Sequence, residues 1–537
     1  MAEQRSDGKK RFVPEVSIYD TTLRDGTQGE GVSLSAEDKL KIAERLDDFG
    51  VAYIEGGWPG SNPKDIDFFH LAQHRRWKNA RIAAFGSTRR AKFSAREDPN
   101  LARLIESGAP VVTIFGKSWD FHVSHALRVT PEENLDMIFD SIEFLKGQNL
   151  EVIFDAEHFF DGYKANRDYA LATLDAAARA GADCLVLCDT NGGTLPAQVA
   201  EIVRGVCAAH STPIGIHVHD DSGLGVANSI MAVQQGAVHV QGTINGYGER
   251  CGNANLCAII PIIQLKMQKS CVPETSLTRL TDVSRFVDEV ANLVPNDRLP
   301  FVGRCAFAHK AGVHVDAMMK HPQTYEHIPP ETIGNYRRVL ISELAGAGSI
   351  IEKAKKYDVD LSKGSPEIKA VLDHVMRLEH DGYSFEGAEA SFELILKKSL
   401  GTYRKLFDLK GFRLIIEKRG PNEEPITEAT LKVAVGGQEA FTVAEGDGPV
   451  HALDNALRLA LRKFYGRELA KIKLSDFKVR VVNSRAGTAA KVRTIIESRD
   501  QTETWTTVGV STNIIEASWS ALADSVEYGL LKHLGGK

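Results

Sequence analysis

Eight short runs of mostly apolar and β-branched residues recur between residue 16 and about residue 245, and longer amphipathic stretches separate them. The runs occupy residues 16–22, 52–57, 81–86, 111–116, 151–158, 184–190, 214–220 and 239–245. Strands that alternate with helices form right-handed βαβ units in a parallel sheet. Eight such units within about 250 residues predict a closed (β/α)8 TIM barrel, an α/β fold. A doubly wound sheet fits the count too, but it explains less well why polar residues gather at so many strand ends.

Helix boundary signals support this division. Ser35 precedes an acidic, amphipathic stretch that Gly50 ends, which is the pattern of an N-cap and a C-terminal stop. Thr130 is followed by Pro131 and two glutamates, which predicts a second helix with proline in its first turn.

Beyond the barrel, the pattern changes twice. We expect a catalytic barrel over residues 14–275, a helical linker subdomain over 276–400 and a C-terminal α+β regulatory domain over 420–537. The last part contains a faint internal repeat, because a shift of 65 residues aligns Thr442 with Thr507 and Ala456 with Ala521. Each copy is interpreted as a ββα-type unit whose helix packs on a sheet.

Composition excludes several classes of protein. The 65 basic and 71 acidic residues leave a net charge of −6, which gives no basic field for nucleic acid. No apolar run approaches the roughly 20 residues needed to span a bilayer, and the N-terminus lacks the apolar core of a signal peptide. Seven cysteines without paired spacing argue against a disulfide framework or a structural zinc site. We therefore expect a cytoplasmic protein that binds neither nucleic acid nor membrane.

Polar residues follow strands one, seven and eight, which are neighbours around a closed barrel. In a TIM barrel, functional side chains gather at the carboxyl ends of the strands. His217 and His219 lie two residues apart in one strand and therefore share a face. With Asp25 and Asn253 they would form an open divalent-metal site. Taken singly, the histidines could pack or cap locally and Asp25 could be a loop carboxylate, but their joint placement favours the metal.

Three further strand-end residues are candidates for chemistry, and each has a structural alternative. Arg24 could stabilise an oxyanion beside the metal or could form an ion pair with a carboxylate. Thr190 could bind a substrate carboxylate or could cap the following helix. Glu157 could tune a ligand or a base, or could form a salt bridge.

Three motifs carry a family resemblance. They are LRDGTQ (23–28) followed after ten residues by Lys39, IGIHVHDDSGLGVANS (214–229) and NGYGERCGNANL (245–256). They resemble the α-isopropylmalate/homocitrate/citramalate synthase group of the metal-dependent TIM-barrel lyase superfamily. The resemblance extends over the linker, with AFAHKAGVHVDA (306–317), and over the C-terminal domain. The segments YDTTLRDGTQGEGVSLSAEDK (19–39), YIEGGWPGSNPKD (53–65) and DAEHFFDGYKAN (155–166) are most similar to the bacterial citramalate synthase branch.

This resemblance implies an acyltransferase that condenses acetyl-CoA with a 2-oxo acid and then hydrolyses the thioester. For the citramalate branch the oxo acid is pyruvate, the product is (R)-citramalate and the role is isoleucine biosynthesis. It also implies a divalent metal ion, with Mg, Mn and Zn not distinguishable, and a homodimer whose linker reaches over the partner's active site. Isoleucine is the effector expected at the C-terminal domain.

The resemblance also implies roles for individual residues. Asp25, His217, His219 and Asn253 correspond to metal-site positions, Arg24 to the contact of the ketone oxygen, Thr190 to the contact of the oxo-acid carboxylate, and Gln28 to a further substrate-binding position. The base lies in the linker, where we favour His314, assisted by Tyr325 or Glu157, with His309 as the alternative.

Other functions stay open at this point. A 2-isopropylmalate or homocitrate synthase would keep the mechanism and use another oxo acid, because a pocket discriminates by only about 1–3 kcal/mol per methylene. A retro-Claisen lyase on the same barrel would have no need of the C-terminal repeat. A metal-binding barrel without catalysis would be expected to have lost some of these ligands, and all of them are present.

Overall fold

The computed structural model describes residues 12–310, 312–339, 366–385, 387–418, 420–482 and 489–535. The chain forms two compact units. The first contains the residues up to Phe307 together with Ile328–Tyr336, and the second contains Ala308–His327 and the chain from Arg337 onward. Each unit is described by itself.

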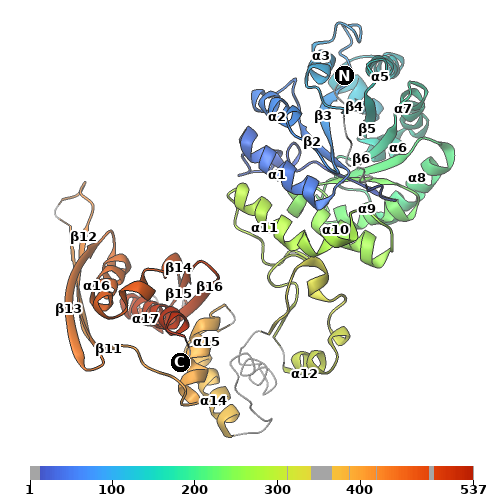
Figure 1. Cartoon of the computed structure of the whole chain (residues 1–537). Coiled ribbons are helices and arrows are strands. Elements are labelled where there is room, and N and C mark those ends of the chain that lie inside the picture. The colour runs from blue at the N-terminus through green and yellow to red at the C-terminus, as the bar shows by residue number, and fades with distance from the viewer. Residues whose placement is uncertain are drawn as a thin grey trace, which may run out of the picture. The chain divides into compact units, whose positions relative to one another are not determined.

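Eight parallel strands form a closed barrel in the first unit, which confirms the predicted fold (Figure 1). They are β1 Ser17–Asp20, β2 Tyr53–Gly57, β3 Arg81–Ser87, β4 Val111–Lys117, β5 Glu151–Glu157, β6 Cys184–Asp189, β7 Ile214–Val218 and β8 His239–Gly242. The ring closes where β8 pairs with β1, with Ser17 opposite His239 and Asp20 opposite Gly242. All eight predicted runs are strands.

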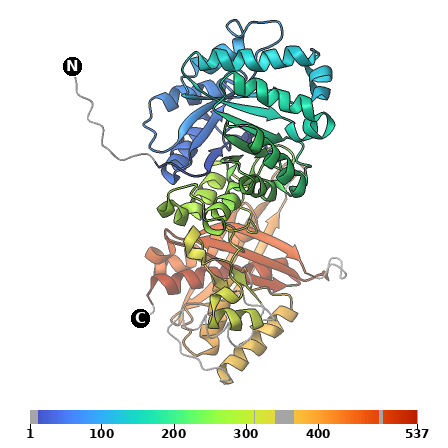
Figure 2. The same cartoon turned by 90° about the vertical axis from the view of Figure 1, so that its right-hand side faces the viewer.

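Helices surround these strands, as the blue-to-green part of the chain shows in Figure 2. The main ones are α1 Ala36–Phe49, α2 Pro63–Gln73, α3 Pro99–Glu106, α5 Pro131–Lys146, α7 Arg167–Arg179, α8 Pro196–Ala209, α9 Gly225–Gln234 and α10 Leu256–Pro261. Shorter turns are η1 Gly26–Gln28, α4 Asp120–His122, η2 Val123–Leu127, α6 Phe159–Ala165, η3 Ile244–Gly246, η4 Ile262–Lys266 and η5 Glu274–Arg279. The predicted boundary signals are confirmed, because Ser35 caps the amide of Asp38, Gly50 ends α1 in the left-handed region and Thr130 caps α5.

The strands are apolar on both faces because both faces are buried. One set of side chains fills the barrel interior, with Val111, Ile153 and Val186 among them. Their neighbours in the same strands, including Val112 and Val152, point outward into the larger core under the helices. The packed interior leaves the polar strand ends as the place where chemistry can occur.

After the barrel, helix α11 (Leu280–Val290) packs against α1. The segment that returns to this unit contains η7 (Pro330–Ile333), and its Ile333 carbonyl accepts a hydrogen bond from Thr281 Oγ1 at 2.8 Å. The Asn335 amide donates to the carbonyls of Phe301 and Gly303 at 2.8 and 3.0 Å. The chain segments just before Ala308 and just after His327 are therefore both held in the first unit by hydrogen bonds.

The second unit begins with a pair of short strands and a set of helices. These elements are β9 Ala308–His309, α12 Gly312–Lys320, η6 Pro322–Thr324, β10 Arg338–Val339, α14 Pro366–His380 and α15 Glu389–Ser399. Helix α15 packs against the C-terminal part of the unit, where Ser391 Oγ accepts the Val508 amide at 3.0 Å. The predicted boundaries 14–275, 276–400 and 420–537 stay a prediction.

The C-terminal part contains two three-stranded antiparallel sheets, each followed by a long helix (Figure 1). They are β11 Asp408–Glu417, β12 Ile426–Val435, β13 Gln438–Gly446 and α16 Pro449–Leu469, then β14 Lys473–Val481, β15 Val492–Arg499, β16 Thr504–Ser511 and α17 Ile514–His533. Thr442 Oγ1 donates to the Ala456 carbonyl at 2.9 Å, and Thr507 Oγ1 donates to the Ala521 carbonyl at 2.7 Å. These equivalent bonds are related by the 65-residue shift, and each repeat has one strand more than the ββα pattern anticipated.

Among the described helices, none has the length and apolar character that crossing a membrane requires.

Candidate active site

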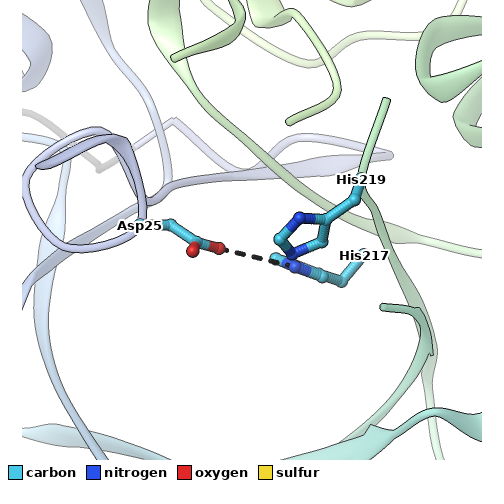
Figure 3. Close-up of side chains that lie close together, drawn as sticks. All are labelled: Asp25, His217 and His219. Carbon is cyan, nitrogen blue, oxygen red and sulfur yellow. Dashed lines mark ion pairs between the residues drawn. The ribbon is translucent and has the colours of Figure 1, made fainter. Parts of the chain in front are cut away.

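Three side chains at the carboxyl end of the barrel converge as a candidate metal centre (Figure 3). Asp25 lies in the turn after β1, His217 lies in β7, and His219 follows that strand. One ligand atom from each residue lies within 4.8 Å of the others, and His217 Nε2 is 3.4 Å from Asp25 Oδ2. All three residues are buried. The ends of strands one and seven therefore lie close together, as predicted.

Asn253 joins this group through the loop between β8 and α10. It forms an isolated bridge with His219 and is buried. Within the described structure, Asp25 Oδ2 and Asn253 Oδ1 are buried and have no hydrogen-bond partner. Buried polar atoms are rarely left unpaired, so two such oxygens beside two imidazoles fit a divalent cation. This ligand set suits Mg²⁺, Mn²⁺ or Zn²⁺.

The ring of His217 is oriented by a hydrogen-bonded pair behind it. Its Nδ1 lies 2.9 Å from Gln241 Oε1, and Gln241 Nε2 donates to Asp155 Oδ1 at 2.9 Å. Because the amide oxygen accepts, Nδ1 carries the proton and Nε2 keeps its lone pair for a metal. Outer partners of this kind commonly fix the tautomer of metal-binding histidines.

The electrostatic surroundings favour ligand-ready protonation states. Burial by itself would raise the pKa of the Asp25 carboxyl, but the Arg24 charge and the two histidines outweigh it and bring the pKa below the ordinary value. Burial lowers the pKa of His217, and it lowers the pKa of His219 to about 3. Near neutral pH the group therefore consists of one carboxylate and two neutral imidazoles, the forms that bind a cation.

Arg24 is held beside this centre by a buried carboxylate. Its Nε donates to Glu55 Oε2 at 2.6 Å, and its Nη1 lies 3.2 Å from Asp25 Oδ1. Tyr19 and Thr21 also donate to Glu55, at 2.7 and 2.6 Å. The guanidinium carbon lies 3.8 Å from the ring centre of Phe85. Arg24 therefore forms the ion pair that was its structural alternative, and its role toward an oxyanion stays a prediction.

The other predicted barrel residues lie at neighbouring strand ends. Thr190 Oγ1 accepts the His158 amide at 3.0 Å, and its own proton has no acceptor among the described residues. Glu157 ends β5 and forms an ion pair with Lys117 from the end of β4. Gln28 ends η1 and is exposed. The structure does not bring Gln28 into hydrogen-bonding contact with the metal group in the part of the chain that it describes.

The linker candidates belong to the second unit, where they lie close to one another. The rings of His314 and Tyr325 are 4.3 Å apart, and both side chains are exposed. His309 Nε2 lies 3.1 Å from Glu326 Oε1, and Glu326 also pairs with Arg337. The involvement of these residues with the barrel site stays a prediction.

Four residues of the site were not found from the sequence: Glu55, Asp155, Gln241 and Arg250. Arg250 pairs with Asp221 at 2.7 Å, and its Nη2 lies 3.1 Å from His219 Nδ1. Glu55 and Gln241 each interrupt an apolar strand run, and that interruption was the available signal. A lone charged residue in a buried strand requires a partner or a function.

Comparisons with known proteins assign each part of the chain to a family. The HMGL-like family matches residues 15–287, the homocitrate synthase post-HMGL domain-like family matches 301–382, and the LeuA allosteric (dimerisation) domain matches 386–530. An (R)-citramalate synthase of Geobacter sulfurreducens is 56% identical over 517 residues, covering 96% of this chain and 98% of that protein. The chain belongs to the (R)-citramalate synthase family.

Two further proteins, one an (R)-citramalate synthase and one a probable 2-isopropylmalate synthase, are similar over nearly their whole length. The protein of Aquifex aeolicus is 53% identical over 522 residues, covering 97% of this chain and 99% of that protein. A probable 2-isopropylmalate synthase of Methanopyrus kandleri is 29% identical over 511 residues, covering 95% of this chain and 97% of that protein. The family resemblance predicted from the three motifs is confirmed.

Proposed function

We propose that this enzyme condenses acetyl-CoA with pyruvate and hydrolyses the thioester, releasing (R)-citramalate and CoA for isoleucine biosynthesis. The observation that carries the proposal is the group of Asp25, His217 and His219 beside Arg24 at the mouth of the barrel. Pyruvate is favoured over other oxo acids because citramalate synthases match at 56% and 53% identity, against 29% for the probable 2-isopropylmalate synthase.

Asp25, His217, His219 and Asn253 would hold a divalent ion. When bound, such an ion acts as a Lewis acid toward a carbonyl oxygen and as a template for the substrate. The unpartnered oxygens of Asp25 and Asn253 support this assignment.

The chain's own side chains would then divide the remaining work. Arg24 faces the ketone oxygen, where its fixed charge stabilises the alkoxide that forms on carbon–carbon bond formation. The Thr190 hydroxyl, with its proton free, donates to the oxo-acid carboxylate, and Gln28 adds a contact at the rim. These residues determine where the ketone carbon lies.

His314 takes a proton from the methyl group of acetyl-CoA, and the resulting enolate carbon attacks the ketone carbon of pyruvate. In the proposed homodimer the linker of one subunit would reach over the barrel of its partner. The Tyr325 ring adjacent to His314 would support this base, and Glu157 would complete the catalytic set from the barrel side. Water then cleaves the thioester, so that CoA leaves as the thiol and the carboxylate of citramalate forms. His309, paired with Glu326, is the alternative base.

The remaining chain would regulate and assemble the enzyme. The match to the LeuA allosteric (dimerisation) domain over residues 386–530 supports a homodimer and an effector site, and we propose isoleucine as the effector. The functional division would be a catalytic barrel at 14–275, a linker at 276–400 and a regulatory domain at 420–537. We propose a cytoplasmic location.

The test is release of CoA thiol from acetyl-CoA with Mg²⁺ or Mn²⁺ across a panel of 2-oxo acids. Release with pyruvate, and (R)-citramalate identified as the product, would support the proposal. Release with 2-oxoisovalerate or 2-oxoglutarate instead would assign the enzyme to a neighbouring branch. Absence of release with every oxo acid would overturn the condensing activity.

A further inference from the structure

The loop between β8 and α10, which carries Asn253, is folded tightly on itself. The Asn253 amide donates to the Gly246 carbonyl at 3.1 Å, and its side-chain Nδ2 lies 3.4 Å from the Tyr247 carbonyl. Gly248 and Gly252 have positive φ values of 157° and 97°. A Cβ at Gly248 would lie 2.5 Å from Asn253 Nδ2, so the backbone itself forms one wall of the Asn253 position.

Helix α11 holds the start of this loop through a buried carboxylate. Asp288 accepts hydrogen bonds from the Tyr247 hydroxyl and from Asn245 Nδ2, the latter at 2.8 Å. Asn245 also exchanges bonds with Ser284, donating to its carbonyl at 2.9 Å and accepting from its hydroxyl at 2.6 Å. These bonds hold Asn245 in the left-handed region at φ 61°. Such a residue costs energy and persists only where its surroundings fix it.

The same helix is fastened at its other end to the returning segment. Thr281, in the first turn of α11, donates to Ile333, and the neighbouring Asn335 bonds to Phe301 and Gly303. One helix therefore contacts both the loop that presents Asn253 and the segment next to the point where the chain leaves this unit at Tyr336.

We propose that Asp288 and Tyr247 are positioning residues through which α11 sets the Asn253 side chain against Asp25. Tyr247 is the connecting residue, because its hydroxyl binds α11 while its carbonyl faces the Asn253 amide and accepts a 2.7 Å bond from Thr243 Oγ1. A shift of α11 moves Tyr247, and the Asn253 amide follows. This inference rests on the metal site proposed above.

The experiment is titration of the full-length protein with Mn²⁺ alone, followed by electron paramagnetic resonance, in the absence of acetyl-CoA and oxo acid. Asp288→Ala removes both acceptor bonds and Tyr247→Phe removes only the hydroxyl. Each should weaken Mn²⁺ binding by about three- to tenfold, less than the 10–100-fold typical of a partner bonded directly to a ligand. Asp288→Asn keeps an oxygen that can accept from Tyr247 and Asn245, so it should bind nearly as the unaltered protein does.

Glu289→Ala is the matched control, because Glu289 is an exposed carboxylate next to Asp288 on the same helix. Its Mn²⁺ affinity should not change. Unchanged affinity in both Asp288→Ala and Tyr247→Phe would overturn the positioning role. If Asp288→Ala does not fold, as judged by circular dichroism, Tyr247→Phe alone decides.

The outcome separates this inference from the proposals on which it depends. Failure of the unaltered protein to bind Mn²⁺ would overturn the metal site and this inference together. The unaltered protein could also bind Mn²⁺, lose affinity in the variants and yet fail to turn over pyruvate. That result would support the positioning role and would count only against the proposed activity.

Discussion

His217 Nε2 lies 3.4 Å from Asp25 Oδ2, although the two residues come from the seventh and the first strand segments of the barrel. The pairing of β8 with β1 closes the ring and makes these segments near neighbours. Gln241 in β8 then orients the His217 ring from behind. The candidate metal centre is thus a direct product of barrel closure.

Removing a ligand from this centre should weaken metal binding strongly without unfolding the chain. Asp25→Asn and His217→Ala each leave an incomplete ligand set, so we expect Mn²⁺ affinity to fall by at least the 10–100-fold that loss of an outer partner costs. Isothermal titration calorimetry measures this. His125→Ala, at an exposed histidine on the same barrel, should retain full affinity, and normal binding by both ligand variants would refute the assignment.

Replacing Arg24 with lysine should reduce turnover strongly. The lysine ammonium has a single nitrogen, so it cannot contact both Glu55 and Asp25 in the planar fork geometry that the Arg24 guanidinium uses. If the guanidinium stabilises the developing oxyanion, kcat should fall by about 10²–10³-fold. Arg75→Lys, at an exposed surface ion pair, is the control in the same thiol-release assay. Turnover within a factor of two of normal would rule out the oxyanion role.

Glu55→Gln should destabilise the barrel. Glu55 is fully buried and accepts from Tyr19, Thr21 and Arg24, so loss of its charge leaves the Arg24 guanidinium with one carboxylate fewer. Breaking a buried pair by changing one partner costs about 3–5 kcal/mol, and the remaining Asp25 contact should hold the loss near the lower figure. Urea unfolding measures the free energy.

The matched change Glu44→Gln affects an ion pair in which both side chains are about half exposed, 3.0 Å from Arg75. Surface pairs contribute little, so its unfolding free energy should change by less than about 1 kcal/mol. Equal effects of the two glutamine variants would contradict the role given to Glu55.

His239 should make the protein sensitive to acid. It is buried between Tyr19 and Tyr53, and burial lowers its pKa from 6.5 to about 3. Below pH 6.5 the unfolded chain takes up a proton that the folded chain does not, so stability present above that pH is lost as the pH falls toward 3. One such group contributes about 1.4 kcal/mol per pH unit in this window.

His239→Leu should therefore flatten the pH dependence of urea unfolding between pH 6.5 and pH 4. Subtracting the variant from the unaltered protein isolates this residue, because other buried groups contribute equally to both. His74→Leu, at an exposed histidine, should leave the slope unchanged. A slope unaffected by His239→Leu would show that another group carries the acid sensitivity.

Isoleucine should bind to the full-length enzyme and inhibit it. A ligand that binds only the folded state raises the melting temperature by mass action, so isoleucine should raise it in a concentration-dependent way and should lower the rate of CoA release. Leucine and valine provide the comparison. If isoleucine caused neither a thermal shift nor inhibition, it would be excluded as the effector.

The strand pattern was predictable because buried parallel strands are apolar along their whole length, and because Ser35 and Gly50 mark helix ends by local chemistry. The convergence of the candidate metal ligands was predictable because His217 and His219 lie two residues apart at the end of one strand and because closure places Asp25 beside them. Glu55 and Gln241 were not found, because an inward-facing residue is recognised only when the residue opposite it is known. The ββα pattern anticipated one strand fewer in each C-terminal repeat. The strands β11 and β14, which open the two repeats, are mostly exposed, so their apolar residues do not form the buried run that marks a core strand.

The pairing of β8 with β1 determines when the barrel and its candidate metal centre can be completed during synthesis on the ribosome. Asp25 is synthesised early, whereas His217 and His219 come with the end of β7 and Asn253 comes only after the last strand, β8. A growing chain therefore has no complete set of ligands and no partner for the outer edge of β1 until β8 has been made. Binding of a divalent ion at the candidate centre would in this way be postponed until the barrel is whole, and the ion would then add its binding energy to a finished domain rather than to a fragment.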